Sequence, residues 1–293
     1  MLILLGYVVV IASVLGGYMI VGGQLGVLMQ PAEVVIICGA ALGAFIVSNN
    51  GKTTKATLKA IPKLGKSGRY NKALFMELMG LLYLLLAKGR QEGMMALERD
   101  VESPEESPLF SRYPKLMADP LLMDFLTDYL RLMISGNMDA FEVESLMDQE
   151  IETFQHEADI PAHALSNVSD GLPAFGIVAA VMGVIHALGS EGLAPEELGP
   201  LIAHAMVGTF LGILLAYGFV APLVTFIRHQ ISETEKMLQC IKVTLLANLN
   251  GYAPPISVEF GRKALYSSER PSFNELEEHV RNVRSQGSGG GQG

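Results

Sequence analysis

The distribution of apolar residues along the chain predicts four membrane-spanning helices arranged as two pairs. The first pair covers residues 1–21 and 34–50, and the second covers residues 171–189 and 201–227. The runs LPAFGIVAAVMGVIHAL and LIAHAMVGTFLGILLAYGFVAPLVTFI contain no Asp, Glu, Lys or Arg. A helix rises about 1.5 Å per residue, so such runs can cross a hydrocarbon core of roughly 30 Å. The expected fold class is an all-α integral membrane protein with four transmembrane helices and a large helical cytoplasmic domain.

Lysine and arginine set the expected orientation of these spans. A basic stretch follows the second span, with no acidic residue before Glu77, and consists of Lys52, Lys55, Lys59, Lys63, Lys66, Arg69 and Lys72. Flanks that remain in the cytoplasm are enriched in Lys and Arg. The connections 22–33 and 190–200 contain neither residue. We therefore expect these two connections to be short outer loops and both chain termini to be cytoplasmic.

The polar segments between and after the pairs show helical periodicity. Residues 51–170 are expected to form a helical cytoplasmic domain, and residues 228–284 a helical tail that begins by extending the fourth span. Within the first segment, Asp119 followed by proline has the pattern of a helix start, and Gly136 that of a helix end. Residues 285–293, rich in Gly and Ser, are expected to be flexible.

Composition narrows the function classes. Of 293 residues, 50% are hydrophobic and 17% charged, more apolar than a typical soluble domain. The net charge of −9 argues against nucleic acid as a partner. Cys38 and Cys240 are too few for a disulfide framework, and no metal-ligand cluster or cofactor motif is visible. No combination of nucleophile, base and orienting group is visible, so we do not expect an enzyme.

Ionisable groups at membrane depth normally mark an ion pathway. Glu33 and Asp170 are expected only at the edges of the spans, and His186 and His204 near their outer ends, where interfacial contacts explain them. Thr209 lies within the fourth span, although its hydroxyl could simply bond its own helix backbone. If the protein moves ions, we expect a second chain to supply the acid.

Prolines and small residues identify positions where the second pair could bend and pack. Pro173 is expected in the first turn of the third span, whereas Pro222 falls inside a continuing helical pattern and should kink it. Gly208 with Gly212, and Ala179 with Gly183, have the four-residue spacing of close helix contacts in lipid. This spacing fits contact with a partner chain and packing within one subunit equally well.

Several long phrases resemble one protein family. LPAFGIVAAVMGVIHALGS, IAHAMVGTFLGILLAYGF, TLLANLNGYAPPISVEFGRK and LYSSERPSF are similar to proton-driven flagellar motor stator subunits of the MotA family. The resemblance extends from MLILLGY to about Val283 and excludes the Gly/Ser tail. Phrases of this length are far more specific than a short motif.

The resemblance implies a subunit of the bacterial inner membrane, with periplasmic loops at 22–33 and 190–200. It implies a ring of five copies around two copies of MotB, which would supply the proton-binding aspartate and a cell-wall anchor. Arg90 and Glu98 would face the rotor protein FliG, while Pro173, Pro222, Ala180 and Thr209 would serve the proton pathway and its coupling to motion. Ala180 favours protons, since sodium-driven relatives tend to have Thr there.

Alternatives remain beside this expectation. Arg90 and Glu98 could form an ordinary exposed salt bridge, worth under about 1 kcal/mol. A proton-channel energiser of the ExbB or TolQ kind is a second possibility, although those proteins typically have three spans. A non-conducting membrane scaffold is a third.

Overall fold

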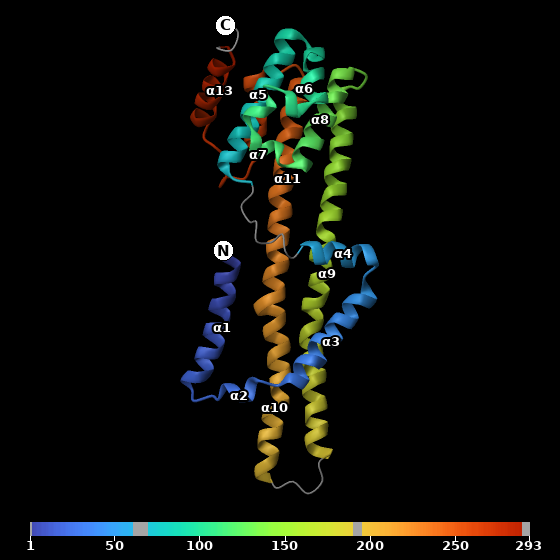
Figure 1. Cartoon of the computed structure of the whole chain (residues 1–293), viewed down its shortest axis with the longest axis vertical. Helices are drawn as coiled ribbons and strands as arrows, with labels where there is room; N and C mark the ends of the chain where they lie inside the picture. The colour runs from blue at the N-terminus through green and yellow to red at the C-terminus, as the bar shows by residue number, and fades with distance from the viewer. Residues whose placement is uncertain (1, 61–69, 190–194, 289–293) are drawn as a thin grey trace. The chain divides into compact units, whose positions relative to one another are not determined.

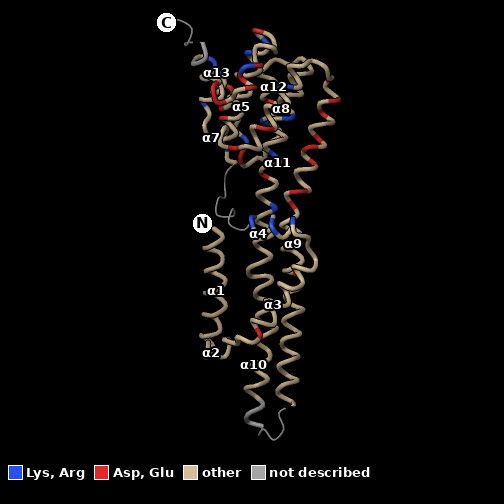
Figure 2. The backbone as a smooth tube through the Cα atoms, turned by 45° about the vertical axis from the view of Figure 1, so that its right-hand side comes forward, with Lys and Arg blue, Asp and Glu red and all other residues tan. Residues whose placement is uncertain are grey.

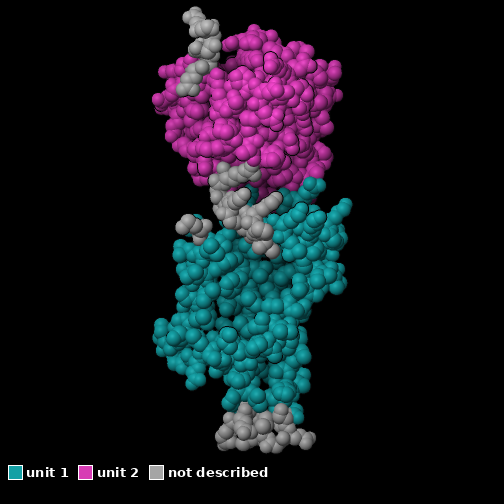
Figure 3. All heavy atoms as spheres, viewed as in Figure 1, with its two compact units in different colours: residues 1–66, 157–230 teal, residues 67–156, 231–293 magenta. Residues whose placement is uncertain are grey.

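The computed structural model describes residues 2–60, 70–189 and 195–288, and its regular secondary structure there is entirely helical (Figure 1). The chain divides into two compact units (Figure 3). Unit 1 comprises residues 1–66 and 157–230, and unit 2 comprises residues 67–156 and 231–293. The expected all-α fold is confirmed.

Unit 1 contains the apolar helices. Its elements are α1 (Leu2–Ile20), α2 (Leu25–Leu28), α3 (Pro31–Ser48), α4 (Gly51–Ala60), the second part of α9 (Ala140–Gly189), α10 (Pro195–Ile213), the π-helix η5 (Leu214–Val220) and the start of α11 (Ala221–Leu249). Residues 2–60, 70–189 and 195–288 contain four helical stretches that are long and apolar enough to cross a membrane. Figure 2 shows unit 1 almost without charged residues along these stretches.

The third span differs from the expectation in its start. Pro173 was expected in a first turn, but it lies well inside α9, a single helix of 50 residues that also contains Pro161. An interior proline removes one backbone hydrogen bond and crowds the preceding turn. Packing against neighbouring helices can outweigh that local cost, because most helical stability in proteins comes from tertiary contacts.

The two expected outer loops are also partly helical. Within 22–33, α2 forms a short helix and α3 begins at Pro31, so Glu33 belongs to the first turn of α3 rather than to a loop. Proline suits the first helical turn because its missing N–H has no partner there. In the other connection α10 begins at Pro195, and residues 190–194 lie outside the described residues, as does 289–293 of the expected tail.

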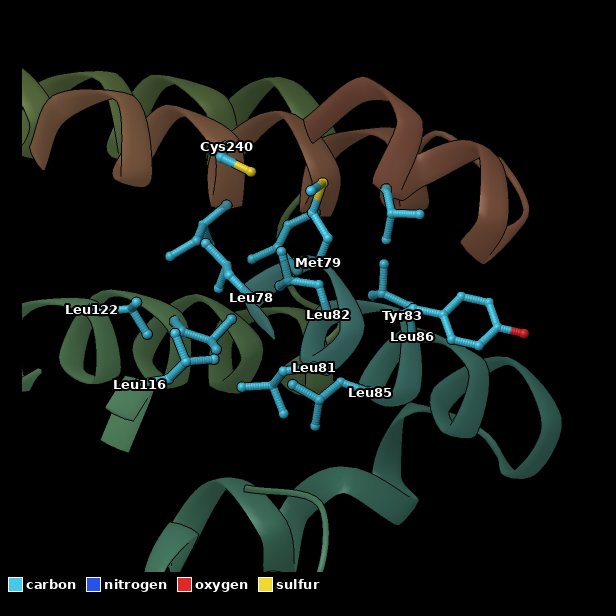
Figure 4. Packing of buried hydrophobic residues seen from close by; sticks show 14 of the residues in the cluster. Leu78, Met79, Leu81, Leu82, Tyr83, Leu85, Leu86, Leu116, Leu122 and Cys240 are labelled. Atoms are coloured by element: carbon cyan, nitrogen blue, oxygen red, sulfur yellow. The ribbon is translucent and has the colours of Figure 1, made fainter. Parts of the chain in front are cut away.

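Unit 2 is organised around α5 (Lys72–Glu92). Its other elements are η2 (Met94–Leu97), α6 (Glu98–Glu102), η3 (Pro104–Glu106), η4 (Phe110–Arg112), α7 (Pro114–Met117), α8 (Pro120–Ser135), α12 (Pro254–Ala264), α13 (Phe273–Ser288) and the adjoining parts of α9 and α11. Every residue from Leu78 to Leu86 is buried, so α5 is covered on all sides rather than along one stripe. Figure 4 shows leucines of α5 pointing both toward Cys240 on α11 and away from it.

Helix ends in unit 2 follow from local side chains. Asp119 accepts a hydrogen bond from the Leu122 amide at 3.5 Å, and Gly136 ends α8 with a left-handed φ of 65°. At α13, the Ser272 amide donates to Glu275 at 2.6 Å while the Glu275 amide donates to the Ser272 hydroxyl at 3.2 Å. This reciprocal pair is a capping box, which defines where α13 begins.

Candidate functional sites in the spans and on the charged hairpin

In unit 1, α9 and α10 pack closely against each other, with glycines at the contact. A Cβ built on Gly212 would lie 2.6 Å from the Leu172 carbonyl oxygen, and one on Gly183 would lie 2.7 Å from the Ala205 Cβ. A Cβ on Gly208 would lie 3.0 Å from the Ala179 Cβ. The four predicted small residues therefore all lie on a contact between two helices of the same chain.

Gly176 completes this contact and was missed in the sequence. A Cβ there would lie 2.7 Å from the Gly208 carbonyl oxygen and 3.0 Å from the Gly212 Cα. Gly176 has the same four-residue spacing to Ala180 that Ala179 has to Gly183, but it was not selected from the sequence. The two helices approach so closely because glycine leaves their backbones uncovered.

Ala180 and Thr209 lie at this same contact. The Ala180 amide nitrogen is 3.1 Å from a Cβ built on Gly208, the residue before Thr209. Both side chains are partly exposed. The structure thus places Ala180 against Gly208 at the contact of α9 with α10, and Thr209 is the next residue along α10.

Glu33, which was expected at the membrane edge, is buried against the same contact. Glu33 is only 8% exposed, and its Oε2 lies 3.0 Å from a Cβ built on Gly208. Among the described residues, that buried oxygen has no hydrogen-bond partner. Because α3 starts at Pro31, the carboxyl group is turned from a loop position onto the packed helices. This chain therefore places a carboxyl group beside Gly208.

The segment before Pro222 is a π-helix. The Ala221 amide donates to the carbonyl of Ala216, five residues earlier. Two side chains from other helices also bond this segment: the Tyr7 hydroxyl donates to the Phe219 carbonyl at 2.9 Å, and the Ser169 hydroxyl donates to the Ala216 carbonyl at 3.1 Å. Neither donor was a predicted site residue, because only the fold brings them there.

Arg90 and Glu98 lie on the two sides of a helix-to-helix turn in unit 2. Arg90 is in the last turn of α5, Gly93 turns the chain with a φ of 90°, and Glu98 begins α6. Both side chains are exposed. No ion pair involving either residue is found in the part of the chain that the structure describes. Within the described residues, Arg90 and Glu98 therefore do not pair with each other.

A buried charge network supports this turn. Lys88 Nζ lies 2.7 Å from Asp100 Oδ2, and the Ser107 hydroxyl donates to Asp100 Oδ1 at 2.6 Å. Asp100 is 4% exposed, so its carboxylate is satisfied from two directions in a place that water barely reaches. The network connects α5 with the residues after α6, which fixes the two charged positions between them. Sequence spacing gave no signal for this pairing.

The described residues contain no group of three or more His, Cys, Asp or Glu side chains that could hold a metal ion. His186, His204 and His229 accordingly take no part in such a cluster. Unit 1 has a glycine-lined contact between two helices with the carboxyl group of Glu33 beside it. Unit 2 has a turn between α5 and α6 with the exposed charges of Arg90 and Glu98. Together with four helices among the described residues that are long and apolar enough to cross a membrane, these features define a helical integral membrane protein.

Comparisons with known proteins narrow this class to one family. Residues 4–93 match the motility protein A N-terminal family, and residues 118–240 match the MotA/TolQ/ExbB proton channel family. The chain is 65% identical to motility protein A of Escherichia coli over 97% of each protein. It is 36% identical to the chemotaxis protein LafT of Vibrio parahaemolyticus, covering 93% of this chain and 96% of that relative. The chain belongs to the motility protein A family.

Solved structures share the fold. The Campylobacter jejuni MotAB structure matches with a TM-score of 0.76 at 20% identity, covering 92% of this chain and 98% of that one. The flagellar MotAB stator complex of Bacillus subtilis matches with a TM-score of 0.75 at 22% identity, covering 91% and 97%.

Proposed function

We propose that this chain is a stator subunit of the bacterial flagellar motor. With MotB it would form a proton-conducting complex that converts proton flow into torque on the rotor protein FliG. The observation that carries this proposal is the 65% identity to motility protein A across nearly the whole chain. The protein would lie in the inner membrane, with both termini and unit 2 on the cytoplasmic side.

The proposed complex contains five copies of this chain in a ring around two copies of MotB. MotB would supply the aspartate that binds the transported proton, near Ala180 and Thr209, and would anchor the complex to the cell wall. The chain itself would need no cofactor. The close contact of α9 with α10 supports this arrangement, since it leaves a compact helix pair to face a central partner.

The energy of one proton suits repeated small steps. Moving one charge through about 150 mV releases roughly 3.5 kcal/mol. Driving a two-state element from 1:99 to 99:1 requires about 5.5 kcal/mol. Each proton would therefore bias a step of the ring around MotB, with Pro173 and Pro222 allowing the spans to adjust.

Arg90 and Glu98 would carry that step to the rotor. Two exposed and unpaired charges of opposite sign can attract charged groups on a passing surface without first breaking an internal ion pair. The Lys88–Asp100 pair supports this role by holding the turn between them.

Torque measurement on tethered beads tests the proposal. We expect Arg90→Glu to reduce torque strongly while membrane abundance and proton leak through an unplugged complex stay at wild-type levels. Arg281→Glu, another exposed arginine, is the control and should leave torque unchanged. Normal torque from Arg90→Glu, or from a complex whose MotB lacks its membrane aspartate, contradicts the proposed function.

Two other functions make different predictions. An energiser of the ExbB or TolQ kind would support another envelope system and would not restore swimming to a strain lacking its own stator subunit. A non-conducting scaffold would give no growth defect when expressed with an unplugged MotB, whereas a proton conductor slows growth through proton leak.

A further inference from the structure

The π-helical segment η5 interrupts the fourth span between α10 and α11. It covers seven residues, Leu214–Val220, directly before Pro222. A π-turn accommodates one more residue than an α-turn, and single π-turns inside α-helices occur frequently at functional positions. Pro222 cannot donate a backbone hydrogen bond, so the helix on this side of η5 has one bond fewer to keep its register.

Two hydrogen bonds from other helices stabilise the π register. Ser169 of α9 donates to the Ala216 carbonyl, which also accepts the Ala221 amide. Tyr7 of α1 donates to the Phe219 carbonyl, and its ring lies 5.1 Å from the Phe219 ring. In a membrane core, water cannot replace a lost partner, so each donor influences which backbone pattern is favoured.

Space for rearrangement lies beside the same segment. An open groove of about 220 Å³ is lined by Ile3, Gly6, Tyr7, Val10, Gly218 and Pro222. Its walls are contributed by α1, η5 and α11. Because α1 has no buried residue and the groove is open, side chains there can shift without first displacing other atoms of this chain.

From these observations, we propose that η5 is a register switch in the fourth span and that Tyr7 and Ser169 are the positioning residues that hold it in the π register. Conversion of η5 to an α-helix would remove one residue from the turn and rotate α10 by about 100° relative to α11. Thr209 and Gly208 lie on α10, so this rotation would turn them relative to α9. The inference rests on the proposed function only in linking this rotation to torque.

Hydrogen exchange on the complex with MotB tests the positioning role without reference to motility. In the double variant Tyr7→Phe and Ser169→Ala, the amides of residues 214–221 should exchange about five-fold faster, which corresponds to about 1 kcal/mol for lost hydrogen bonds. The matched control is Tyr18→Phe with Ser166→Ala, on the same two helices, which should not change exchange there. Equal exchange in the double variant and wild type overturns the proposal.

Deleting Leu215 tests the switch itself, because the shorter segment favours an α register. We expect the deletion variant to reach the membrane and to protect residues 214–221 more strongly, yet to give little torque. Wild-type torque from this variant overturns the register switch. If exchange responds as expected but the wild-type complex with MotB gives no torque, the proposed function fails while the positioning role of Tyr7 and Ser169 stands. If the deletion variant does not reach the membrane, the exchange of the double variant decides.

Discussion

The two units bury different kinds of side chain. The largest fully buried side chains are almost all in unit 2, including Phe110, Phe125 and Leu82, whereas unit 1 contributes Ile37. The buried cluster of unit 1 also includes Ala41, Ala179 and Ala216. Many large apolar residues of its spans are instead exposed, among them Leu42 and Ile185, and α1 has no buried residue at all.

This difference follows from the solvent that each unit meets. In water, burying large apolar side chains drives folding, and the all-round burial of α5 is the result. In lipid, Leu and Val gain little by leaving the surroundings, so helices associate through close backbone packing. The stability of unit 2 therefore depends on large side chains that fill its core. The stability of unit 1 depends on glycines that let its helices approach closely.

The strongest test of this contrast truncates one leucine in each unit. Leu82→Ala removes a 0% exposed side chain from the unit 2 core and should lower the free energy of unfolding by about 2–5 kcal/mol. Leu42→Ala, 59% exposed in α3, should change it by less than about 0.5 kcal/mol. Denaturant unfolding of the purified complex, followed by circular dichroism, measures both. Equal losses would mean that the two units are stabilised alike.

Enlarging a small residue, the opposite change, should destabilise the protein at the close helix contact of unit 1. In Gly212→Ala the added Cβ would meet backbone atoms of Leu172 and Gly176, so the helices must separate at a cost of about 1–3 kcal/mol. Gly39→Ala on α3 is the control, since a Cβ there has nothing within 4 Å among the described residues. Thermal stability of the complex in lipid nanodiscs measures the difference. A Gly212→Ala protein as stable as Gly39→Ala would show that the close contact is not required.

Much of this fold could be predicted from the sequence because hydrophobicity and helix ends are local. The four spans, the start of α8 at Asp119 and its end at Gly136 depend on neighbouring residues, and the structure confirms them. Arg90 and Glu98, on either side of the turn at Gly93, were selected because the sequence resembles the MotA family. Their function stays a prediction.

What could not be predicted depends on contacts between distant segments. Tyr7 bonds a carbonyl 212 positions later, and Ser169 one 47 positions later. The burial of Glu33 could not be predicted either, because it depends on the packing of α3 against Gly208, 175 positions later. Pro173 was expected in a first turn because the continuous helix α9 depends on packing along its length, which local proline rules do not include.

A substitution in the buried charge network of unit 2 should change the free energy of unfolding by a smaller amount. Asp100→Asn keeps an acceptor for the Ser107 hydroxyl but removes the charge that Lys88 meets at 2.7 Å. Because Lys88 is partly exposed, we expect a loss of only about 1 kcal/mol in the free energy of unfolding. Denaturant unfolding compared with Asp128→Asn, whose partner Arg131 keeps Glu102, measures it. A loss equal to the control would indicate that burial adds nothing to the pair.

The smallest expected effect is a pH dependence of the contact between α13 and α5 in unit 2. His279 of α13 is the titratable group there. A Cβ on Gly80 would lie 2.7 Å from His279 Nε2, and this buried nitrogen has no partner among the described residues. Burial lowers the pKa of His279, while the Met76 backbone and Glu77 oppose that shift. Tyr113 faces the same position.

The direction of the pH effect follows from the lowered pKa of His279. When α13 is released, the imidazole regains its ordinary pKa of about 6.5, so the released state binds more protons as pH falls. Docking of α13 should therefore weaken below about pH 6.5. Glu275 cannot mask this effect, because Lys72 and Ser272 lower its pKa to about 2 and it stays ionised throughout. Hydrogen exchange of α13 amides, compared between pH 8 and pH 5.5 and corrected for intrinsic rates, should show this loss in wild type and a smaller one in His279→Gln. An identical pH response in both proteins would assign it to another group.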